Sequence, residues 1–155
     1  MKIYLVQHGK PVSKQENSEK PLSDEGRSDI KKMAAYLKRA GIRIDAVYNS
    51  GKTRARQTAE ILGAVLVPEK EPEVKKGLGP LDDVKLMFDE IRLLEKDIII
   101  VGHLPHLEKL TSLLVTGGDS HSVVRFQQGG VVCITSDEET EKWHIAWMQI
   151  PGMVA

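Results

Sequence analysis

The 155-residue sequence contains a single cysteine, Cys133, and no surplus of either charge. One cysteine cannot form a disulfide within the chain, and a cysteine-based zinc site needs several thiolates or histidines. The 22 basic residues are balanced by 22 acidic ones. This balance argues against a nucleic-acid partner, because general affinity for nucleic acid requires an excess of Lys and Arg. Composition therefore excludes a disulfide scaffold and disfavours a nucleic-acid-binding protein.

Long apolar runs are missing as well. The first apolar run, residues 3–6, is shorter than the core of roughly 7–15 residues that a secretory signal requires. No run approaches the roughly 18–20 residues of a membrane span. We therefore expect a cytoplasmic protein with no membrane partner. The apolar share of 41% is typical of a globular chain, and the length predicts one domain over residues 1–155.

Apolar segments alternate between a period of two and a helical period along the chain. We expect strands at 3–6, 45–48, 65–67, 98–101, 123–126, 131–135 and 143–149, and helices at 23–40, 53–62, 82–95 and 105–115. Strand–helix alternation predicts βαβ units and a parallel sheet, and the closing strands make that sheet mixed. The sequence thus predicts an α/β fold, a three-layer α/β/α domain with a mixed, mostly parallel sheet.

Several details of this assignment can be checked separately. Ser23 or Asp24 is expected to cap the helix 23–40, and Asp82 or Asp83 the helix 82–95. Trp143 and Trp147 stand four residues apart in one strand, so we expect them to share a face and pack there. Cys133 lies in an apolar strand and is expected to be buried and inert.

Three predicted strands end in residues that suit an anion. Gln7-His8-Gly9 follows the first strand, Asn49-Ser50-Gly51 the second, and Gly102-His103 the strand 98–101. In open α/β sheets, ligands bind beyond the carboxyl ends of the strands. Arg54, at the start of the next helix, can bind a phosphoryl group through its planar fork, and a histidine can attack it. The sequence therefore predicts a phosphoryl site.

Two other motifs compete with this interpretation. Residues 46–53 end in Gly51-Lys52-Thr53 and imitate a nucleotide-binding phosphate loop. Residues 46–49 are needed as a strand, however, so they cannot form a glycine-rich loop. His103 and His106 could suggest a metal pair, but Pro105 and the lack of neighbouring cysteines disfavour it. Neither motif displaces the phosphoryl site.

Four motifs in order resemble the histidine phosphatase superfamily. They are Leu5-Val6-Gln7-His8-Gly9, Pro21-Leu22-Ser23-Asp24-Glu25-Gly26-Arg27, Arg54-Ala55-Arg56-Gln57-Thr58-Ala59 and Val101-Gly102-His103. The small size and the closing pattern, from Val124 through Gly130 to Pro151, are similar to the short SixA-type branch of phosphohistidine phosphatases. The resemblance spans nearly the whole chain and implies a phosphoglycerate mutase-like fold.

The resemblance also implies a mechanism. His8 would attack phosphorus and form a phosphohistidine intermediate, which water would hydrolyse. Arg54 and His103 would hold the phosphoryl oxygens, whose charge must be met in the transition state. No metal or organic cofactor is implied. The substrate would be a phosphorylated protein carrying phosphohistidine, or a small phosphorylated molecule.

Gln7 departs from the family pattern, which places arginine directly before the nucleophile. An amide can still donate a hydrogen bond to phosphate, but it has no charge and fewer donors than a guanidinium. We therefore expect weakened phosphatase chemistry. The alternative is an inactive phosphate- or phosphohistidine-binding regulator. Lys10, Lys52 or Arg56 could supply the missing charge.

No general acid is evident in the sequence. Glu73, Asp82 and Asp83 are candidates, although each is also accounted for as a loop or helix-capping residue. An imidazole leaving group can already carry its proton in the substrate, so it needs less help than an alkoxide. This favours phosphohistidine and leaves a small-molecule phosphomonoesterase as a further alternative.

Overall fold

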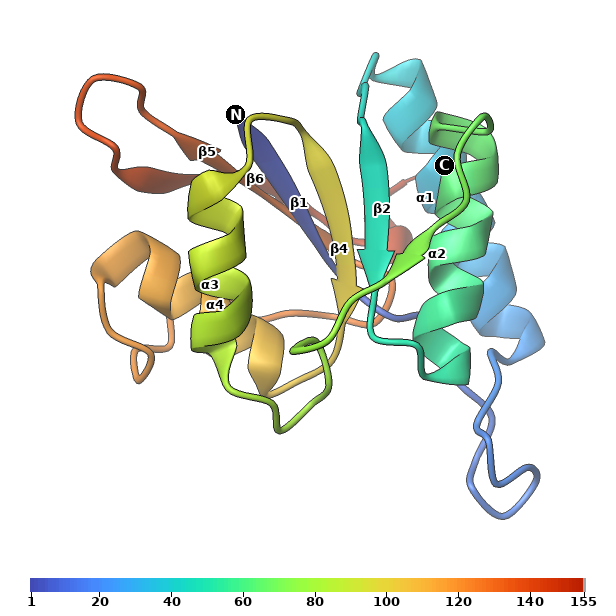
Figure 1. Cartoon of the computed structure of the whole chain (residues 1–155). Coiled ribbons are helices and arrows are strands. Elements are labelled where there is room, and N and C mark those ends of the chain that lie inside the picture. The colour runs from blue at the N-terminus through green and yellow to red at the C-terminus, as the bar shows by residue number, and fades with distance from the viewer. Residues whose placement is uncertain (155) are drawn as a thin grey trace.

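The computed structural model describes residues 1–154 and contains one sheet between two pairs of helices (Figure 1). The strands are β1 (Lys2–Gln7), β2 (Ala46–Asn49), β3 (Glu73–Val74), β4 (Ile98–Gly102), β5 (Val131–Ser136) and β6 (Trp143–Gln149). The helices are α1 (Asp24–Arg39), α2 (Thr53–Leu66), α3 (Val84–Leu93), α4 (His106–Thr116) and the 3-10 helix η1 (Pro151–Met153). The strand–helix alternation expected for the first two thirds of the chain is present.

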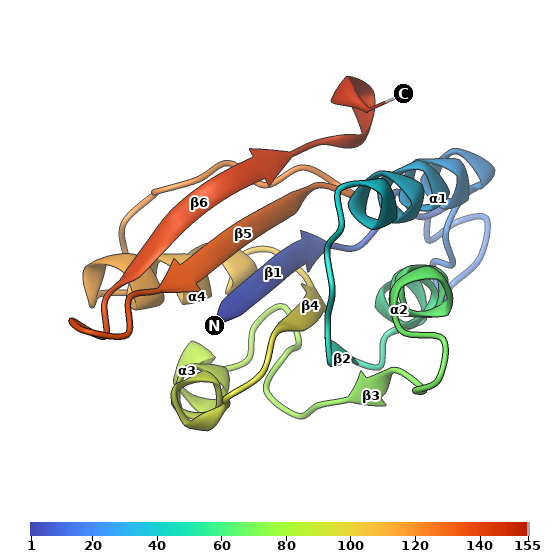
Figure 2. The same ribbon diagram turned by 90° about the horizontal axis from the view of Figure 1, so that it is seen from above.

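The six strands lie in the order β3-β2-β4-β1-β5-β6. The pairs β1–β4, β2–β4 and β2–β3 are parallel, whereas β5 runs antiparallel to both β1 and β6. Helices α1 and α2 cover one face of the sheet, and α3 and α4 cover the other (Figure 2). The predicted three-layer fold with a mixed, mostly parallel sheet is confirmed.

Side chains alternate between the two faces along each central strand. In β1, Ile3 and Leu5 pack under α3 and α4, while Tyr4 and Val6 pack under α1 and α2. All four side chains are at most 2% exposed. Because both faces are buried, the central strands are continuous apolar runs rather than alternating ones.

The chain reverses its direction of travel across the sheet between the neighbouring strands β1 and β4. From β1 it crosses through α1 to β2 on one side, and from β4 it crosses through α4 to β5 on the other. The register pairs Val6 with Val101 and Gln7 with Gly102. His8 and His103, the next residues, therefore leave the sheet side by side at the point where α/β folds bind ligands.

The prediction of a third strand at 65–67 is wrong. Val65 and Leu66 form the last turn of α2, and Val67 caps it with its backbone N–H on the Gly63 carbonyl. These apolar residues belong to the buried side of the helix, packed with the α1–α2 core. The edge strand is β3, a two-residue exposed segment between the predicted strand 65–67 and the predicted helix 82–95.

The expected strand at 123–126 is also absent, because no strand pairs with this segment in the part of the chain described. Its apolar content has another cause, since Phe126 is buried in the α3–α4 core and Val124 packs against it. Apolar residues here mark a segment that crosses the end of the core. They do not mark a hydrogen-bonded strand.

Trp143 and Trp147 do not share a face, contrary to the expectation from their spacing. Cys133 pairs with Trp147 but Ile134 pairs with Ile145, so β6 carries one extra residue at a bulge. A bulge reverses the alternation beyond it. Trp143 consequently lies in the α3–α4 core, while Trp147 packs near Tyr4 on the other face, with ring centroids 6.0 Å apart.

The expected caps are resolved by the structure. Ser23 accepts the Gly26 N–H at the start of α1, and Asp83 accepts the Lys85 N–H at the start of α3. Cys133 is buried as expected, and burial raises its pKa to about 11. Over residues 1–154, no helix has the length and apolarity needed to cross a bilayer.

Candidate active site

His8 sits directly beyond the end of β1 and is only 7% exposed. Its backbone N–H donates to the Gly102 carbonyl (3.1 Å), which keeps the residue attached to β4. Its ring atom Nδ1 lies 2.7 Å from the Gly9 carbonyl oxygen. Because a carbonyl oxygen can only accept, the hydrogen of the neutral ring lies on Nδ1. The lone pair of Nε2 is thereby directed away from Gly9 and into the site.

Arg54 and His103 lie beside that lone pair. The Nε–H of Arg54, in the first turn of α2, donates to His8 Nε2 at 3.3 Å. The rings of His8 and His103 are 5.0 Å apart between centroids and tilted by 52°. The structure therefore brings together the three residues that the sequence indicated. An anion held by the Arg54 guanidinium would lie next to the Nε2 atom of His8.

His103 has a partner to which the sequence assigned no role. Its Nε2 lies 2.7 Å from the Ser50 hydroxyl oxygen, which also accepts the backbone N–H of Lys52 at 3.3 Å. The Nδ1 atom of His103 is buried without a hydrogen-bond partner in the described part of the chain. Ser50 stands at the end of β2 in the sequence, and that position was the available signal for a site residue.

Both histidines are electrically neutral at pH 7. Burial, partly opposed by the Gly9 carbonyl and reinforced by the charges of Arg54 and Lys20, lowers the pKa of His8 to about 4. Burial, followed by His8, Arg54 and Lys52, lowers the pKa of His103 to about 3. A neutral imidazole is the nucleophilic form. The site thus combines an unprotonated His8 with nearby cations.

Gln7 leaves this site with an uncharged amide whose Oε1 is buried and has no partner among residues 1–154. Two of the three cations expected to replace the missing arginine are engaged elsewhere. Lys10 pairs with Glu25 at 2.9 Å and Arg56 pairs with Glu60 at 3.6 Å. The third, Lys52, is near enough to lower the pKa of His103.

Lys20 was missed by the sequence reasoning although its charge lowers the pKa of His8. It stands at the base of a loop closed by a bridge between Pro11 and Leu22 and by the Val12 N–H on the Pro21 carbonyl (2.8 Å). Its backbone has a positive φ of 50°. Its place just before the Pro-Leu-Ser block was the only available signal. The charge of Lys20 therefore acts on the nucleophile from this loop.

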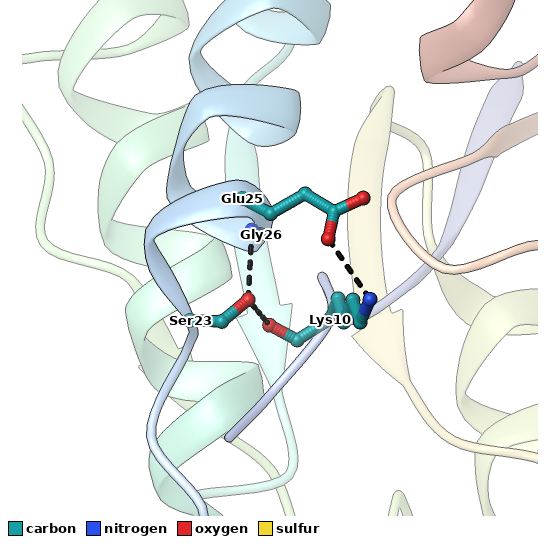
Figure 3. A network of polar contacts seen from close by, with 4 residues as sticks. All are labelled: Lys10, Ser23, Glu25 and Gly26. Atoms are coloured by element: carbon teal, nitrogen blue, oxygen red, sulfur yellow. Dashed lines mark hydrogen bonds and ion pairs between the residues drawn. The ribbon is translucent and has the colours of Figure 1, made fainter.

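The Leu22-Ser23-x-x-Gly26 block has a structural explanation (Figure 3). The Ser23 hydroxyl donates to the Lys10 carbonyl (2.9 Å) and accepts the Gly26 N–H (3.0 Å). A Cβ on Gly26 would lie 2.2 Å from the Lys10 carbonyl oxygen, so no larger residue fits. The first turn of α1 therefore packs directly against the backbone that follows His8.

The block at the start of α2 fixes the same loop from the other side. The Thr58 hydroxyl accepts the Gly9 N–H (3.1 Å) and donates to the Arg54 carbonyl (2.8 Å). The Gln57 side-chain oxygen accepts the Leu22 N–H at 2.7 Å. These residues hold Arg54 and the segment after His8 in a fixed relation. Two motifs that are distant in sequence thus act as one support.

No carboxylate contacts the two histidines in the part of the chain described. Asp82 accepts the Gly79 N–H at 2.8 Å, Asp83 caps α3, and Glu73 is exposed on β3. None of these three groups is among those that shift the pKa of His8 or His103. Residues 1–154 also contain no group of three or more His, Cys, Asp or Glu side chains that could hold a metal ion.

A buried neutral histidine beside an arginine, at the switch point of an α/β sheet, matches the arrangement that the sequence predicts for a phosphoryl site. The comparison with protein families agrees, because residues 3–82 match the model of the histidine phosphatase superfamily (branch 1). This match covers more than half of the chain. The chain belongs to the histidine phosphatase superfamily.

The proteins similar to this chain include SixA proteins. The chain is 27% identical over 154 residues to the phosphohistidine phosphatase SixA of Escherichia coli K12, covering 94% of each. A structure of the protein histidine phosphatase SixA with tungstate superposes with a TM-score of 0.86, at 25% identity and 98% coverage of both chains. The alpha-ribazole phosphatase of Shigella flexneri shares the fold (TM-score 0.77, 15% identity, 97% of each chain).

Proposed function

We propose that this protein is a metal-independent phosphatase that removes the phosphoryl group from phosphohistidine in a protein. One observation carries the proposal: a neutral, buried His8 stands beside Arg54 and His103, and within residues 1–154 no carboxylate lies among the groups that act on either histidine. Such a site provides a nucleophile and cations but no strong acid. It therefore suits a leaving group that brings its own proton.

The reaction proceeds in two displacements. Nε2 of His8 attacks phosphorus as the substrate N–P bond breaks, and a protonated substrate ring departs as neutral imidazole. Arg54 and His103 bind the phosphoryl oxygens through the transfer. Water then attacks the phosphorus of the phosphohistidine on His8, which releases inorganic phosphate and restores the neutral ring. Lys20 and Lys52 add positive charge that the amide of Gln7 lacks.

The choice of phosphohistidine over a phosphomonoester rests on the leaving group. The alcohol of a serine or sugar phosphate departs as an alkoxide, so its departure needs a positioned acid. The candidate carboxylate Asp82 accepts a backbone N–H of its own loop, and Asp83 accepts the Lys85 N–H in the first turn of α3. The name of the E. coli relative, a phosphohistidine phosphatase, supports the same choice.

The test is phosphate release without added metal from a phosphohistidine-bearing protein and from phosphoserine. Wild type is expected to release phosphate from the first and much less from the second. His8→Ala is expected to abolish release, whereas His144→Ala, in the exposed part of β6, serves as a matched control. Release that survives His8→Ala, or equal hydrolysis of phosphoserine, would contradict the proposal.

A second function is favoured by Gln7 alone. It places an uncharged amide, whose Oε1 has no partner among residues 1–154, where the family pattern has a guanidinium, which suits a protein that binds phosphohistidine with little turnover. Tungstate and vanadate imitate phosphate, and a SixA protein has been solved with tungstate. Vanadate binding without measurable phosphate release by wild type would support this regulator function over the enzyme.

A further inference from the structure

A groove of about 600 Å³ opens beside the candidate active site. It begins at Ser50, whose hydroxyl contacts His103, and continues along the loop between β3 and α3. We call it the Lys76 groove. Its lining consists of Ser50, Gly51, Lys52, Lys75, Lys76, Gly77, Gly79, Pro80, Leu81 and Asp82. The phosphatase mechanism uses only the residues at one end of it.

The Lys76 groove is basic. Three lysines line it against one carboxylate, that of Asp82, which accepts a backbone N–H of the same loop. Lys75 is part of the wall, because it pairs with Glu90 at 3.3 Å and lies 4.6 Å from the centre of the Tyr48 ring. Lys52 and Lys76 are exposed, and neither forms an ion pair among residues 1–154. Their charges are free to meet an acidic partner.

Exposed apolar side chains surround the groove. Leu81, in its lining, is 88% exposed, and Val74 and Leu86 are 62% and 61% exposed. Val74 lies against Gly51 and Leu86 against Gly77, at 3.0 Å and 3.1 Å from where a Cβ of each glycine would stand. Clustered exposed apolar residues mark interaction surfaces. A small phosphorylated molecule in the site would leave Leu81 uncovered, whereas a protein would cover it.

We infer that the Lys76 groove docks the protein that carries the phosphohistidine, through a segment that pairs carboxylates with an apolar side chain. Lys52 and Lys76 attract the carboxylates, and Leu81 with its apolar neighbours contacts the apolar side chain. This inference rests on the proposed function, since it names how the substrate of that reaction is held. Charge complementarity selects an acidic partner, and the contact with Ser50 places its phosphorylated residue toward His103.

The experiment compares a protein substrate with a small one. Leu81→Asp and Lys76→Glu are expected to lower kcat/KM for the phosphohistidine-bearing protein about tenfold each. Both variants should hydrolyse phosphoimidazole at the wild-type rate, because neither residue touches the reacting groups. Leu93→Asp is the matched control, since Leu93 is 84% exposed and lies outside the groove; Lys31→Glu, on α1, is the charge control.

The outcomes separate the two proposals. Equal losses with both substrates, or no loss with either, would overturn docking at the groove. If wild type shows no His8-dependent hydrolysis of phosphoimidazole, this result would instead contradict the proposed phosphatase activity itself. Docking can then still be measured in a His8→Ala background, where the phosphoprotein is not consumed. There Leu81→Asp should raise the Kd about tenfold and Leu93→Asp should not, and an unchanged Kd would overturn the inference.

Discussion

The two ends of the sheet carry depressions that are opposite in charge and similar in volume. Each has an open depression: about 600 Å³ beyond the carboxyl end, lined by three lysines, and about 660 Å³ at the amino end. The second is lined by Met1, Ile91, Arg92, Leu94, Glu95, Asp97, Ser136, Asp137, Glu138, Glu141 and Trp143. Size does not distinguish them, because the larger one lies away from the histidines.

Chemistry distinguishes them instead. The carboxyl end holds the buried His8 and His103, whose rings are 5.0 Å apart, and Arg54, which donates to His8, at the point where the chain reverses its direction across the sheet. The carboxylates at the amino end, such as Asp137, accept local backbone N–H groups. The net charge of zero is the sum over both ends, so it does not reveal this separation of charge. Amino-acid composition sets only the total charge of the chain. Strand topology sets which end of the sheet carries the positive and which the negative side chains.

The strongest test of the contrast removes the cation that contacts His8. Arg54→Gln should lower kcat for phosphohistidine hydrolysis about 10²–10³-fold, because one preformed donor to the transition state is lost. Stopped-flow phosphate release at saturating substrate measures the effect. Arg92→Gln, at the amino-end depression, is the control and should leave kcat unchanged. An equal fall in both variants would show a stability effect rather than a loss at the site.

Acidification should also act first on the carboxyl end. His8 and His103 have lowered pKa values of about 4 and about 3, against 6.5 when unfolded. Between those values the unfolded chain binds more protons, so stability is complete above pH 6.5 and falls as the pH is lowered. From pH 6.5 to 5 we expect a loss of about 2 kcal/mol per histidine. Urea unfolding at several pH values measures this loss.

The amino end should contribute nothing over that interval. Asp137 there also has a lowered pKa, but its stabilising contribution is lost only as the pH falls below its ordinary value of 3.8. His103→Gln should therefore remove about half of the loss expected from the two histidines between pH 6.5 and 5, and Asp137→Asn should leave that loss unchanged. A wild-type curve that is already flat down to pH 5 would contradict neutral buried histidines.

Gln7→Arg sharpens the contrast by adding charge at the carboxyl end. A guanidinium supplies a charge and more donors than the amide, so we expect turnover of phosphohistidine protein to rise about tenfold. The measurement is kcat, with Gln128→Arg, at an exposed position, as the control. A fall in kcat with an unaltered fold would mean that Gln7 is adapted to this site and that Lys20 and Lys52 already meet the phosphoryl charge.

The smallest effect is expected at the amino end. The double variant Glu95→Gln, Glu138→Gln removes two carboxylates from the depression there. We expect kcat/KM for the phosphohistidine-bearing protein to change less than about twofold, because strand β4 separates the two ends of the sheet by roughly 15 Å, about twice the Debye length of about 8 Å at physiological salt. Steady-state phosphate release checks this. A larger change would show that the acidic end takes part in substrate capture.

The buried strands and the amphipathic helices could be predicted because burial imposes their periods on the sequence. Three errors came from interactions that a period does not encode. Val65 and Leu66 complete the buried side of α2 rather than a strand. Residues 123–126 are apolar because Phe126 fills the core. One extra residue in β6 turned Trp147 to the face opposite Trp143. Each error reflects tertiary contacts that override local pattern.

The site was predictable at its centre and not at its margins. His8, Arg54 and His103 follow from strand ends and motifs, which the register of β1 and β4 brings together. The engagement of Lys10 with Glu25, by contrast, depends on how α1 seats after β1. The approach of Lys20 to His8 depends on the path of the loop between them. Side-chain direction in a loop leaves no periodic trace in a sequence.

The bridge between Pro11 and Leu22 has a consequence for how such a protein can diversify. It closes the segment 12–21 at its base, and the Val12–Pro21 hydrogen bond reinforces that closure. Insertions at the tip of this segment leave the base, and with it the backbone after His8, where it is. Each doubling of the loop length costs only about 0.6 kcal/mol in closure entropy. Insertions that enlarge this loop, which follows the nucleophile in the chain, therefore cost little stability.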